Sequence, residues 1–348
     1  MRIKFLPAFN GDCILISFQY EGKKKNILID GGIPRTYLHH LKPELERLIQ
    51  QGESIDLLII THIDDDHIGG IKELYQDVEL KKDFIKQVWF NSGDLLSDYF
   101  KAESEVIRAV EIIKNDQTTM SVGQGITLEK ALKEEKGNWV QELICVSNEK
   151  INYLNLSITV LSPNEEGLKK LHKHWETEMD KKVKMSEEHD DFNVSISELI
   201  KRKFNEDRAV PNGSSMALLI ERDNKSILLL GDAHPGVISE SLQQLELASE
   251  GNKLKINLVK VSHHASKGNT SPKLLALIEC DKFVVSTDGR KHGLPDKEAI
   301  ARIIASQPNS IIYFNYDEIS KEIFSKEDKE SYSFSCSLLS KTDYSIEL

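Results

Sequence analysis

The stretch IDLLIITHIDDDHIGG, residues 55–70, places a run of apolar residues directly before two histidines and three consecutive aspartates. The apolar run 55–60 has the length and composition of a buried β-strand. Three adjacent carboxylates repel one another, and this repulsion opposes folding unless a cation balances it. Imidazole and carboxylate groups are common protein ligands of zinc and other divalent metals. The stretch therefore predicts a metal site directly after a strand, with Gly69 and Gly70 allowing a tight turn into a helix.

Three later apolar runs also end in histidines or aspartates. The runs and the residues that follow them are 226–230 before Gly231 and Asp232, 256–261 before Ser262, His263 and His264, and 283–286 before Thr287, Asp288 and Gly289. If these strands lie beside the strand 55–60, their polar residues converge on one rim of a sheet. That rim is where open α/β sheets commonly form their binding sites.

The remaining sequence alternates between strand and helix patterns, which is typical of an α/β protein. The first thirty residues are predicted to form two strands around a turn at 20–25. Further predicted elements are helices at 35–52, 98–115 and 126–136, and strands at 86–93, 154–163 (half-buried) and 215–221. The charged, mostly helical stretch of about 164–208 is predicted to be an insertion, and the residues after about 310 a C-terminal extension. Both belong to a single predicted domain, residues 1–348.

Composition narrows the class of protein. The 45 lysines and arginines against 56 aspartates and glutamates give a net charge of -11. This is unlike a dedicated high-affinity nucleic-acid binder, whose contacts with phosphates usually come from a basic face. A nuclease stays compatible with this charge, because two bound divalent cations would locally offset an acidic site.

The four cysteines are widely spaced, and no apolar run approaches the roughly 20 residues of a membrane helix. We therefore expect a cytoplasmic protein with reduced thiols and no membrane partner.

The histidine–aspartate stretch resembles the metallo-β-lactamase superfamily, whose motif His-x-His-x-Asp-His follows a strand. Here an aspartate stands in place of the second histidine, and this variant is most similar to the hydrolase domain of ComEC-type DNA-uptake competence proteins. Four further segments resemble motifs of that family in the same order: NGDCILI (10–16), ILIDGG (27–32), LLLGDA (228–233) and VKVSHHASK (259–267). The resemblance spans about residues 1–300. It implies an α/β fold in which two mixed β-sheets lie between helical layers, an αββα sandwich.

The resemblance also implies a site for two divalent metal ions on the rim shared by the two sheets. The ligands carried over by position are His62 and Asp64 for one ion, Asp66 and His67 for the other, and Asp232 as the bridge.

Four more residues take roles near this site by the same resemblance. One of the adjacent residues His263 and His264 would be the remaining histidine ligand, and the other would lie further out or contact substrate. Asp30 would brace the ligand loop from behind, and Asp12 would lie close to the site.

Three positions depart from the family's pattern. The superfamily's usual third histidine, before the Gly-Asp motif, has no clear match, and Asn212 stands where the competence-type proteins have asparagine. Ala265 replaces the glycine that usually follows the paired histidines. Related chains often read Gly-His-Pro, whereas this sequence reads Gly-Leu-Pro, with Leu294 in place of the histidine. Either His292 takes the role of that histidine or the role is absent.

Two cations about 3.5–4 Å apart lower the pKa of a shared water toward neutrality and hold an anionic oxygen, which predicts hydrolysis. We expect Asp66 to orient or deprotonate that water, and His264 or His263, with Lys260, to stabilise the leaving side. The donors suit Zn²⁺ or Mn²⁺, and Mg²⁺ is a further candidate because Asp64 makes the first site harder.

Three functions stay open at the level of sequence. The first hypothesis is a metal-dependent phosphodiesterase or nuclease with nucleic acid or a nucleotide as substrate, since harder ions suit phosphodiesters and the competence-type proteins are implicated in cutting DNA. The second is a hydrolase of a carboxylic ester, thioester or lactam. The third is a non-catalytic, metal-binding regulatory module, for which Leu294 and the missing third histidine are the arguments. The sequence predicts no oligomeric state.

Overall fold

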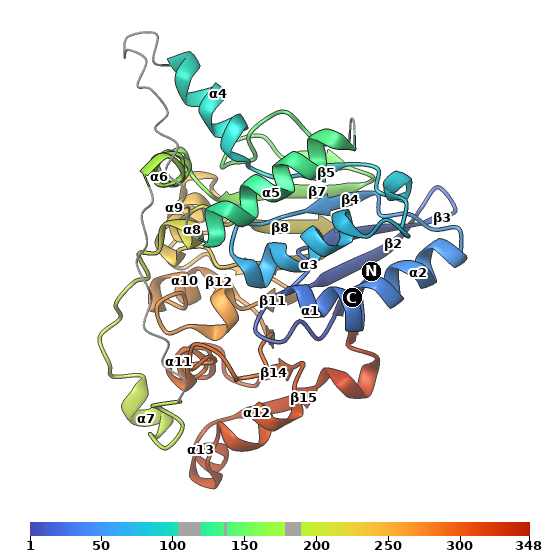
Figure 1. Ribbon diagram of the computed structural model, residues 1–348. Coiled ribbons are helices and arrows are strands. Elements are labelled where there is room, and N and C mark those ends of the chain that lie inside the picture. The colour runs from blue at the N-terminus through green and yellow to red at the C-terminus, as the bar shows by residue number, and fades with distance from the viewer. Residues whose placement is uncertain (104–119, 136–137, 178–188) are drawn as a thin grey trace.

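Two β-sheets dominate the computed structural model, which describes residues 1–103, 120–135, 138–177 and 189–348 (Figure 1). Within these residues the first sheet has six strands, in the order β16 (Ser345–Glu347), β1 (Arg2–Phe5), β2 (Ile14–Tyr20), β3 (Lys23–Ile29), β4 (Leu57–Ile59) and β5 (Val88–Trp89). The second has eight, in the order β15 (Phe334–Leu338), β14 (Ser310–Phe314), β13 (Lys282–Val285), β11 (Leu258–Lys260), β9 (Lys225–Leu229), β8 (Ala217–Arg222), β7 (Leu156–Ser162) and β6 (Ile151–Tyr153). Two short strands, β10 (Leu254–Lys255) and β12 (Ile278–Glu279), pair apart from both sheets.

Parallel and antiparallel pairs occur in both sheets. In the first, β3 is antiparallel to β2 and parallel to β4. In the second, β9 is antiparallel to β8 and parallel to β11, which is in turn parallel to β13. The parallel strands β3 and β4 of one sheet and β9, β11 and β13 of the other carry the motif residues just past their carboxyl ends.

Helices contribute to an apolar layer outside each sheet. Outside the six-stranded sheet lie α2 (Lys42–Gln50), α3 (Asp65–Gln76), α4 (Gly93–Glu103), α5 (Met120–Glu134) and α6 (Glu165–Thr177). Outside the eight-stranded sheet lie α7 (Ile196–Leu199), α9 (Pro235–Gln244), α10 (Pro272–Leu277), α11 (Lys297–Ser306) and α12 (Asp317–Glu322). The other helical segments are α1 (Pro34–Thr36), α8 (Val210–Gly213), α13 (Lys326–Ser331), a π-helical turn at Tyr37–Leu41, and 3-10 turns at Lys82–Phe84, Ser262–Ala265 and Leu339–Thr342.

Strand residues alternate between these outer layers and a third apolar layer between the sheets. Ile27 and Ile29 of β3 face the middle layer, whereas Leu28 faces the helices. Strand β9 repeats the pattern in the second sheet. Because both faces of each sheet are buried, such strands appear in the sequence as continuous apolar runs. The predicted α/β class and αββα arrangement are confirmed.

Two predictions about individual elements are wrong. The first thirty residues form three strands, because the chain turns between Pro7 and Gly11 and returns as β2 against β1. The predicted strand 154–163 is buried along nearly its whole length as β7, since it lies between β6 and β8 and between two apolar layers. Helix α4 covers the start of the predicted helix 98–115, and the range 104–115 lies outside the described residues.

The two segments expected to decorate the domain contribute to its structure. The stretch 164–208 supplies α6 and α7, and its residues 178–188 lie outside the described part. After residue 310, β14 and β15 continue the second sheet, and β16 pairs with β1 at the edge of the first. The division into one domain with an insertion and an extension stays a prediction. Among the described residues, no helix combines the length and apolar character needed to cross a membrane.

Candidate metal centre

The motif residues gather on the rim where the two sheets meet. His62 and His67 follow β4 of the first sheet, whereas Asp232 follows β9 and the pair His263–His264 follows β11 of the second. The expectation that all four polar-ended strands lie side by side is therefore wrong for β4, which belongs to the other sheet. The polar ends still converge, because the carboxyl ends of β4, β9 and β11 reach the same rim. We call His62, Asp64, Asp66, His67, Asp232, His263 and His264 the metal centre.

Helix α3 begins at Asp65, so the predicted ligands Asp66 and His67 lie in its first turn. Gly69 and Gly70 lie within this helix, and the expected turn at these glycines before a helix is therefore wrong. The carbonyl oxygen of Asp64 accepts hydrogen bonds from the backbone N–H groups of His67 (2.9 Å) and Ile68 (3.0 Å). The loop before β2 packs closely against this turn, since a Cβ on Gly11 would lie 1.8 Å from the carbonyl oxygen of Asp66. The loop before β2 therefore needs glycine at position 11, because a side chain there would collide with the first turn of α3.

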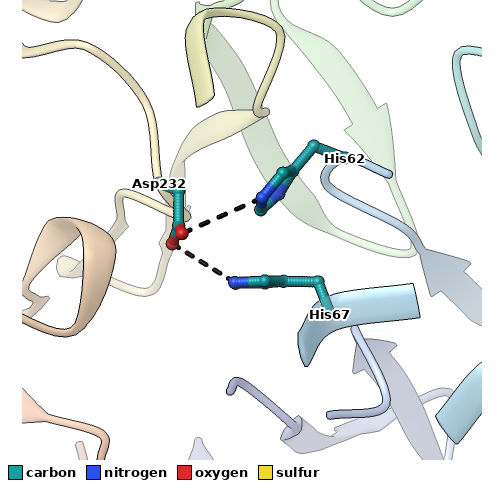
Figure 2. A group of neighbouring side chains, drawn as sticks. All are labelled: His62, His67 and Asp232. Carbon is teal, nitrogen blue, oxygen red and sulfur yellow. Dashed lines mark ion pairs between the residues drawn. The ribbon is translucent and has the colours of Figure 1, made fainter. Parts of the chain in front are cut away.

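Asp232 lies at the middle of the centre, with imidazole rings on several sides. Its Oδ1 lies 3.3 Å from Nε2 of His67, and its Oδ2 lies 3.8 Å from Nε2 of His62 (Figure 2). The Nε2 atoms of His263 and His264 lie 3.7 Å and 3.8 Å from the same Oδ2. Both late histidines thus point at Asp232, and the distances do not single out one of them as the ligand.

Four donor atoms of the centre are buried without a hydrogen-bond partner among the described residues. They are the Nε2 atoms of His62, His67 and His264, and Oδ1 of Asp232. Each such atom costs about 1–3 kcal/mol when it is left unsatisfied, so four in one place require an explanation. A divalent metal ion takes imidazole nitrogen and carboxylate oxygen as ligands and would satisfy all four.

Two overlapping sets of these residues have metal-site dimensions. Nitrogen and oxygen atoms of His62, His67 and Asp232 lie within 4.8 Å of one another, and so do those of Asp66, His67 and His264. The residues present therefore fit the divalent metal ions that the family resemblance implies.

The remaining two carboxylates lie at the open side of the centre. Asp66 Oδ2 lies 3.6 Å from Nε2 of His264 and accepts a hydrogen bond from Asn10 Nδ2 (3.1 Å). Asp64 Oδ2 lies 3.7 Å from Nε2 of His62. Both carboxylates line the cavity described below, where they can meet water or substrate.

The second ring nitrogen of each histidine has a partner that orients the ring. His67 Nδ1 lies 2.8 Å from Asp30 Oδ2, and Thr61 donates to the same carboxylate through its N–H (2.8 Å) and its hydroxyl (2.7 Å). His264 Nδ1 donates to the carbonyl oxygen of Ser286 (2.8 Å). Such outer partners fix the tautomer and direction of metal-binding rings. Asp30 therefore lies behind the ligand loop.

Three consecutive left-handed residues aim the late histidines. The φ angles are 46° at His263, 51° at His264 and 66° at Ala265. Non-glycine residues adopt this conformation at a cost of order 1–3 kcal/mol each, and such strain concentrates at functional sites. The loop is held by backbone hydrogen bonds from His263 N to Gly231 O (2.9 Å) and from Asp296 N to Ala265 O (3.0 Å).

Charges within the centre shift its pKa values in opposite directions. Burial lowers the pKa of His67, but the carboxylates of Asp232 and Asp30 outweigh it, so this pKa is raised well above 6.5. Burial raises the pKa of Asp232, and the positive charges of His67, His263 and His264 reverse the effect and lower it. In Asp66 the nearby ring of His264, whose Nε2 lies 3.6 Å from Oδ2, and the charge of His67 likewise outweigh burial and lower the pKa. Without metal, a proton on His67 therefore balances part of the negative charge of Asp232 and Asp30.

Lys260 does not lie where the sequence analysis expected a leaving-group contact, whereas Asp12 lies close to the centre, as expected. The side chain of Lys260 is 0% exposed, forms an ion pair with Asp12 and donates to the carbonyl oxygen of Gly231 (3.3 Å). Lys260 lies outside the cavity lining. The expected contact between Lys260 and a leaving group is therefore wrong, because the lysine is enclosed behind the centre. Asp12 Oδ1 lies 3.8 Å from Nδ1 of His264, so the pair supports the late histidines.

Asn212 lies beside His263 and not among the donor atoms. Its Nδ2 lies 3.4 Å from Nδ1 of His263 and donates to Asp207 Oδ2 (2.7 Å). Asp207 also accepts from Asn269 Nδ2 (3.1 Å), and Asn269 Oδ1 lies 3.0 Å from Nδ1 of His263. The sequence analysis missed Asp207, Asn269 and Asn10. Asn10 and Asp207 contact Asp66 and His263 across long sequence separations, whereas Asn269 lies close to His263 in the chain.

A cavity of about 900 Å³ opens onto the metal centre. His292 lines it and has a left-handed backbone (φ 61°), while Leu294 is largely buried at the same wall. Burial and the charge of Lys291 lower the pKa of His292, so it is neutral at pH 7. His292 is therefore placed to contact a bound substrate.

A further acidic group near the cavity has a different explanation. The carboxylates of Asp190, Asp191 and Asp296 lie within 4.8 Å of one another. Asp191 accepts from the backbone N–H groups of Lys297 (3.1 Å) and Glu298 (2.8 Å) at the start of α11. Lys267 Nζ lies 3.1 Å from Asp296 and 3.6 Å from Asp190. These carboxylates are satisfied by the protein itself and need no cation.

One family model matches the first part of the chain. The family model of the metallo-beta-lactamase superfamily matches residues 6–129, which contain both β3 and the ligand loop after β4. Together with the two-sheet topology, this match identifies the fold as the metallo-β-lactamase fold. No curated protein matches the chain. The closer similarity to competence-type hydrolases stays a prediction.

Several solved structures are similar to this chain at low sequence identity. The metallo-beta-lactamase fold protein YhfI from Bacillus subtilis is 12% identical over 97% of this chain and 95% of its own, with a TM-score of 0.38. Zn²⁺-bound PqqB from Methylobacterium extorquens is 10% identical over all of both chains, with a TM-score of 0.45. CmlA, a diiron β-hydroxylase from Streptomyces venezuelae, is 12% identical over 96% of this chain and 52% of its own, with a TM-score of 0.39.

Proposed function

We propose that this protein is a metal-dependent hydrolase that cleaves phosphodiesters at a centre for two divalent metal ions. The observation that carries the proposal is the set of buried donor atoms on His62, His67, His264 and Asp232 that have no hydrogen-bond partner among the described residues. The metal ions would be Zn²⁺ or Mn²⁺, with Mg²⁺ as a further candidate, because imidazole and carboxylate donors are mixed. When bound, they would lower the pKa of a water molecule and neutralise charge on the reacting phosphate.

The chain's own residues would hold the ions and position the reactants. Asp232 has Nε2 of His67 near its Oδ1 and the Nε2 atoms of His62, His263 and His264 near its Oδ2, so its two oxygens would hold the ions together with these histidines. Asp66 stays ionised at neutral pH because its pKa is lowered, so it can accept a hydrogen bond from the attacking water and orient it. His263 faces the cavity, where it can donate to a substrate oxygen. The oxygen donors of Asp64 and Asp66 favour the harder ions that suit phosphodiesters.

The test compares two adjacent carboxylates. Asp66→Asn removes the carboxylate that faces His264, whereas Asp65→Asn is its matched control, since Asp65 accepts a hydrogen bond from Gln124 instead. Bound metal is measured by elemental analysis, and hydrolysis is measured on bis-p-nitrophenyl phosphate, p-nitrophenyl acetate and a chromogenic lactam with Mn²⁺ or Zn²⁺. We expect about two metal ions per chain and phosphodiester turnover that falls more than about 100-fold in Asp66→Asn. Asp65→Asn should retain turnover.

Other outcomes would assign the site differently. Turnover of the ester or lactam without the phosphodiester would replace the substrate class and keep the metal-dependent hydrolase. Bound metal with no turnover of the three substrates would indicate a regulatory module. A protein that binds no metal would contradict the proposal as a whole.

A further inference from the structure

The cavity over the metal centre is lined by both acidic and basic residues. Its volume of about 900 Å³ is in the range of sites that enclose a small-molecule ligand. Its acidic lining residues are the three carboxylates of the metal centre, Asp64, Asp66 and Asp232, together with Asp190, Glu206, Asp207, Asp296 and Glu298. The basic residues of the remaining lining are Arg202, Lys203, Lys267, Lys291 and Arg302.

Three of these basic residues form ion pairs with carboxylates. Arg202 Nη1 lies 3.2 Å from Glu298, and Arg302 forms an ion pair with the same glutamate. Lys267 Nζ lies 3.1 Å from Asp296. Each of the three is therefore already held by a carboxylate, although the two arginines share one.

Lys203 and Lys291 differ from the other three. Within the described part of the chain, no ion pair or side-chain hydrogen bond involves either ammonium group, although acidic residues outnumber basic ones in this protein. Both lysines line the same cavity as Asp64 and Asp66. Two lysines that have no ion pair among the described residues therefore lie on the wall of an acidic site.

Contacts of the backbone hold both lysines on the cavity wall. Lys291 belongs to a turn whose Gly293 carbonyl oxygen accepts a hydrogen bond from His189 Nδ1 (3.0 Å). The segment that carries Lys203 is tied down by Asp207 N, which donates to Gly268 O (3.0 Å). The positions of the two cations are thus set by the fold, while their flexible side chains stay available.

We propose that Lys203 and Lys291 bind phosphates that flank the scissile one, so that the preferred substrate is an oligonucleotide or a nucleotide with an additional phosphate. This inference rests on the proposed phosphodiesterase function. A neutral ester or lactam offers nothing for these two ammonium groups to bind, whereas lysine is a common point-charge partner of phosphate.

The experiment uses two ligands with the same scissile bond. The dinucleotide TpT carries one phosphate, and pTpTp carries a further phosphate at each end. Binding of both is measured by calorimetry on chelator-treated protein at low salt, and kcat/KM for both is measured on metal-loaded protein. The variants are Lys203→Gln and Lys291→Gln, and Lys225→Gln is the control, because Lys225 begins β9 at the end opposite to Asp232.

We expect the wild type to bind pTpTp at least about tenfold more tightly than TpT, since charge-assisted hydrogen bonds to phosphate are among the strong ones. Each lysine variant should reduce this ratio by about threefold or more, and Lys225→Gln should leave it unchanged. The ratio of kcat/KM for the two ligands should follow the same order.

The two arms separate this inference from the proposed function. If bis-p-nitrophenyl phosphate and both dinucleotides are cleaved but pTpTp gains nothing over TpT, the flanking-phosphate subsite is wrong and the phosphodiesterase stands. The subsite is also wrong if both lysine variants keep the wild-type ratio. If neither dinucleotide is cleaved but the binding ratio depends on the lysines, the phosphate subsite stands and the proposed reaction fails.

Discussion

The carboxylate of Asp30 lies 2.8 Å from Nδ1 of His67, and it also accepts two hydrogen bonds from Thr61. Asp30 directly follows β3, so through this contact the end of β3 sets the direction of the His67 ring, which follows β4 in the chain. The hydroxyl of Thr61 in turn lies 3.0 Å from Nδ1 of His62. One buried carboxylate thus orients two of the candidate ligands, one directly and one through a hydroxyl.

We predict that Asp30→Asn weakens metal binding by about 10- to 100-fold, as is usual when an outer partner of a ligating histidine is changed. The amide keeps the shape of the side chain but removes the charge that stabilises the ring of His67. The measurement is competition for Zn²⁺ with a chelating dye, and the control is Asp223→Asn on an exposed turn. Unchanged affinity in Asp30→Asn would show that the contact does not orient a ligand.

Metal removal should lower the free energy of unfolding. A ligand at about 1,000 times its Kd stabilises the folded state by about 4 kcal/mol. When the metal leaves, the buried donor atoms that have no hydrogen-bond partner among the described residues lose the ion that would satisfy them. Calorimetry with chelator and with added Mn²⁺ or Zn²⁺ should therefore show a lower Tm in the chelated protein. Asp232→Asn should not respond to metal in this way. A Tm that is the same with and without chelator would contradict the metal centre.

The metal-free protein should lose stability in alkaline solution. His67 has a raised pKa in the folded protein, so its stabilising contribution is complete below about pH 6.5, its usual unfolded value, and is lost as the pH rises through the folded value. Asp66 and Asp232 have lowered pKa values, so their contribution is present above about pH 3.8 and is lost as the pH falls through the folded values.

Urea unfolding of chelator-treated protein at pH 5.5, 7 and 8.5 checks this prediction. The free energy of unfolding should decrease across the series, and His67→Gln should flatten the decrease. Metal affinity should rise over the same range, because binding displaces the protons of the histidines. A metal-free protein that is most stable at pH 8.5 would show that His67 is not protonated in the folded state.

Lys260→Met should destabilise the protein by about 3–5 kcal/mol, because it leaves the buried carboxylate of Asp12 without its cation. The double variant Lys260→Met with Asp12→Leu should recover part of that loss, since apolar residues often replace a buried ion pair without a large penalty. Chemical unfolding of metal-free protein measures both. Equal stability of the single variant and the wild type would mean that Asp12 is balanced by another group.

The sequence predicted the residues on the rim of the site better than the residues that contact them from behind. Strand 55–60 and the polar residues after β9 and β11 are visible in the sequence, because apolar runs buried on both faces end abruptly at the rim. Asp207 was not predicted, since an acidic residue within a charged stretch looks like ordinary surface until Gly268 and Asn269 are brought against it. The sequence analysis expected Lys260 on the substrate side of the centre. Local sequence does not show that Asp12 forms an ion pair with this lysine and encloses it behind the centre.

The same limit applies to the fold. Burial of β7 on both faces depends on its position between β6 and β8 and between two apolar layers, which no local pattern records. The contribution of residues after 310 to both sheets likewise depends on pairings over long sequence separations, such as β16 with β1. Local periodicity predicts elements, whereas the order of strands within a sheet is a property of the whole chain.

The position of the metal centre on the seam between two sheets has a mechanical consequence. His62 and His67 are attached to one sheet, and Asp232 and His264 to the other. A bound ion therefore acts as a cross-link that joins the two halves of the sandwich at their rim. Loss of that cross-link should let the halves separate locally, and amide hydrogen exchange near the ends of β4 and β11 would quicken together.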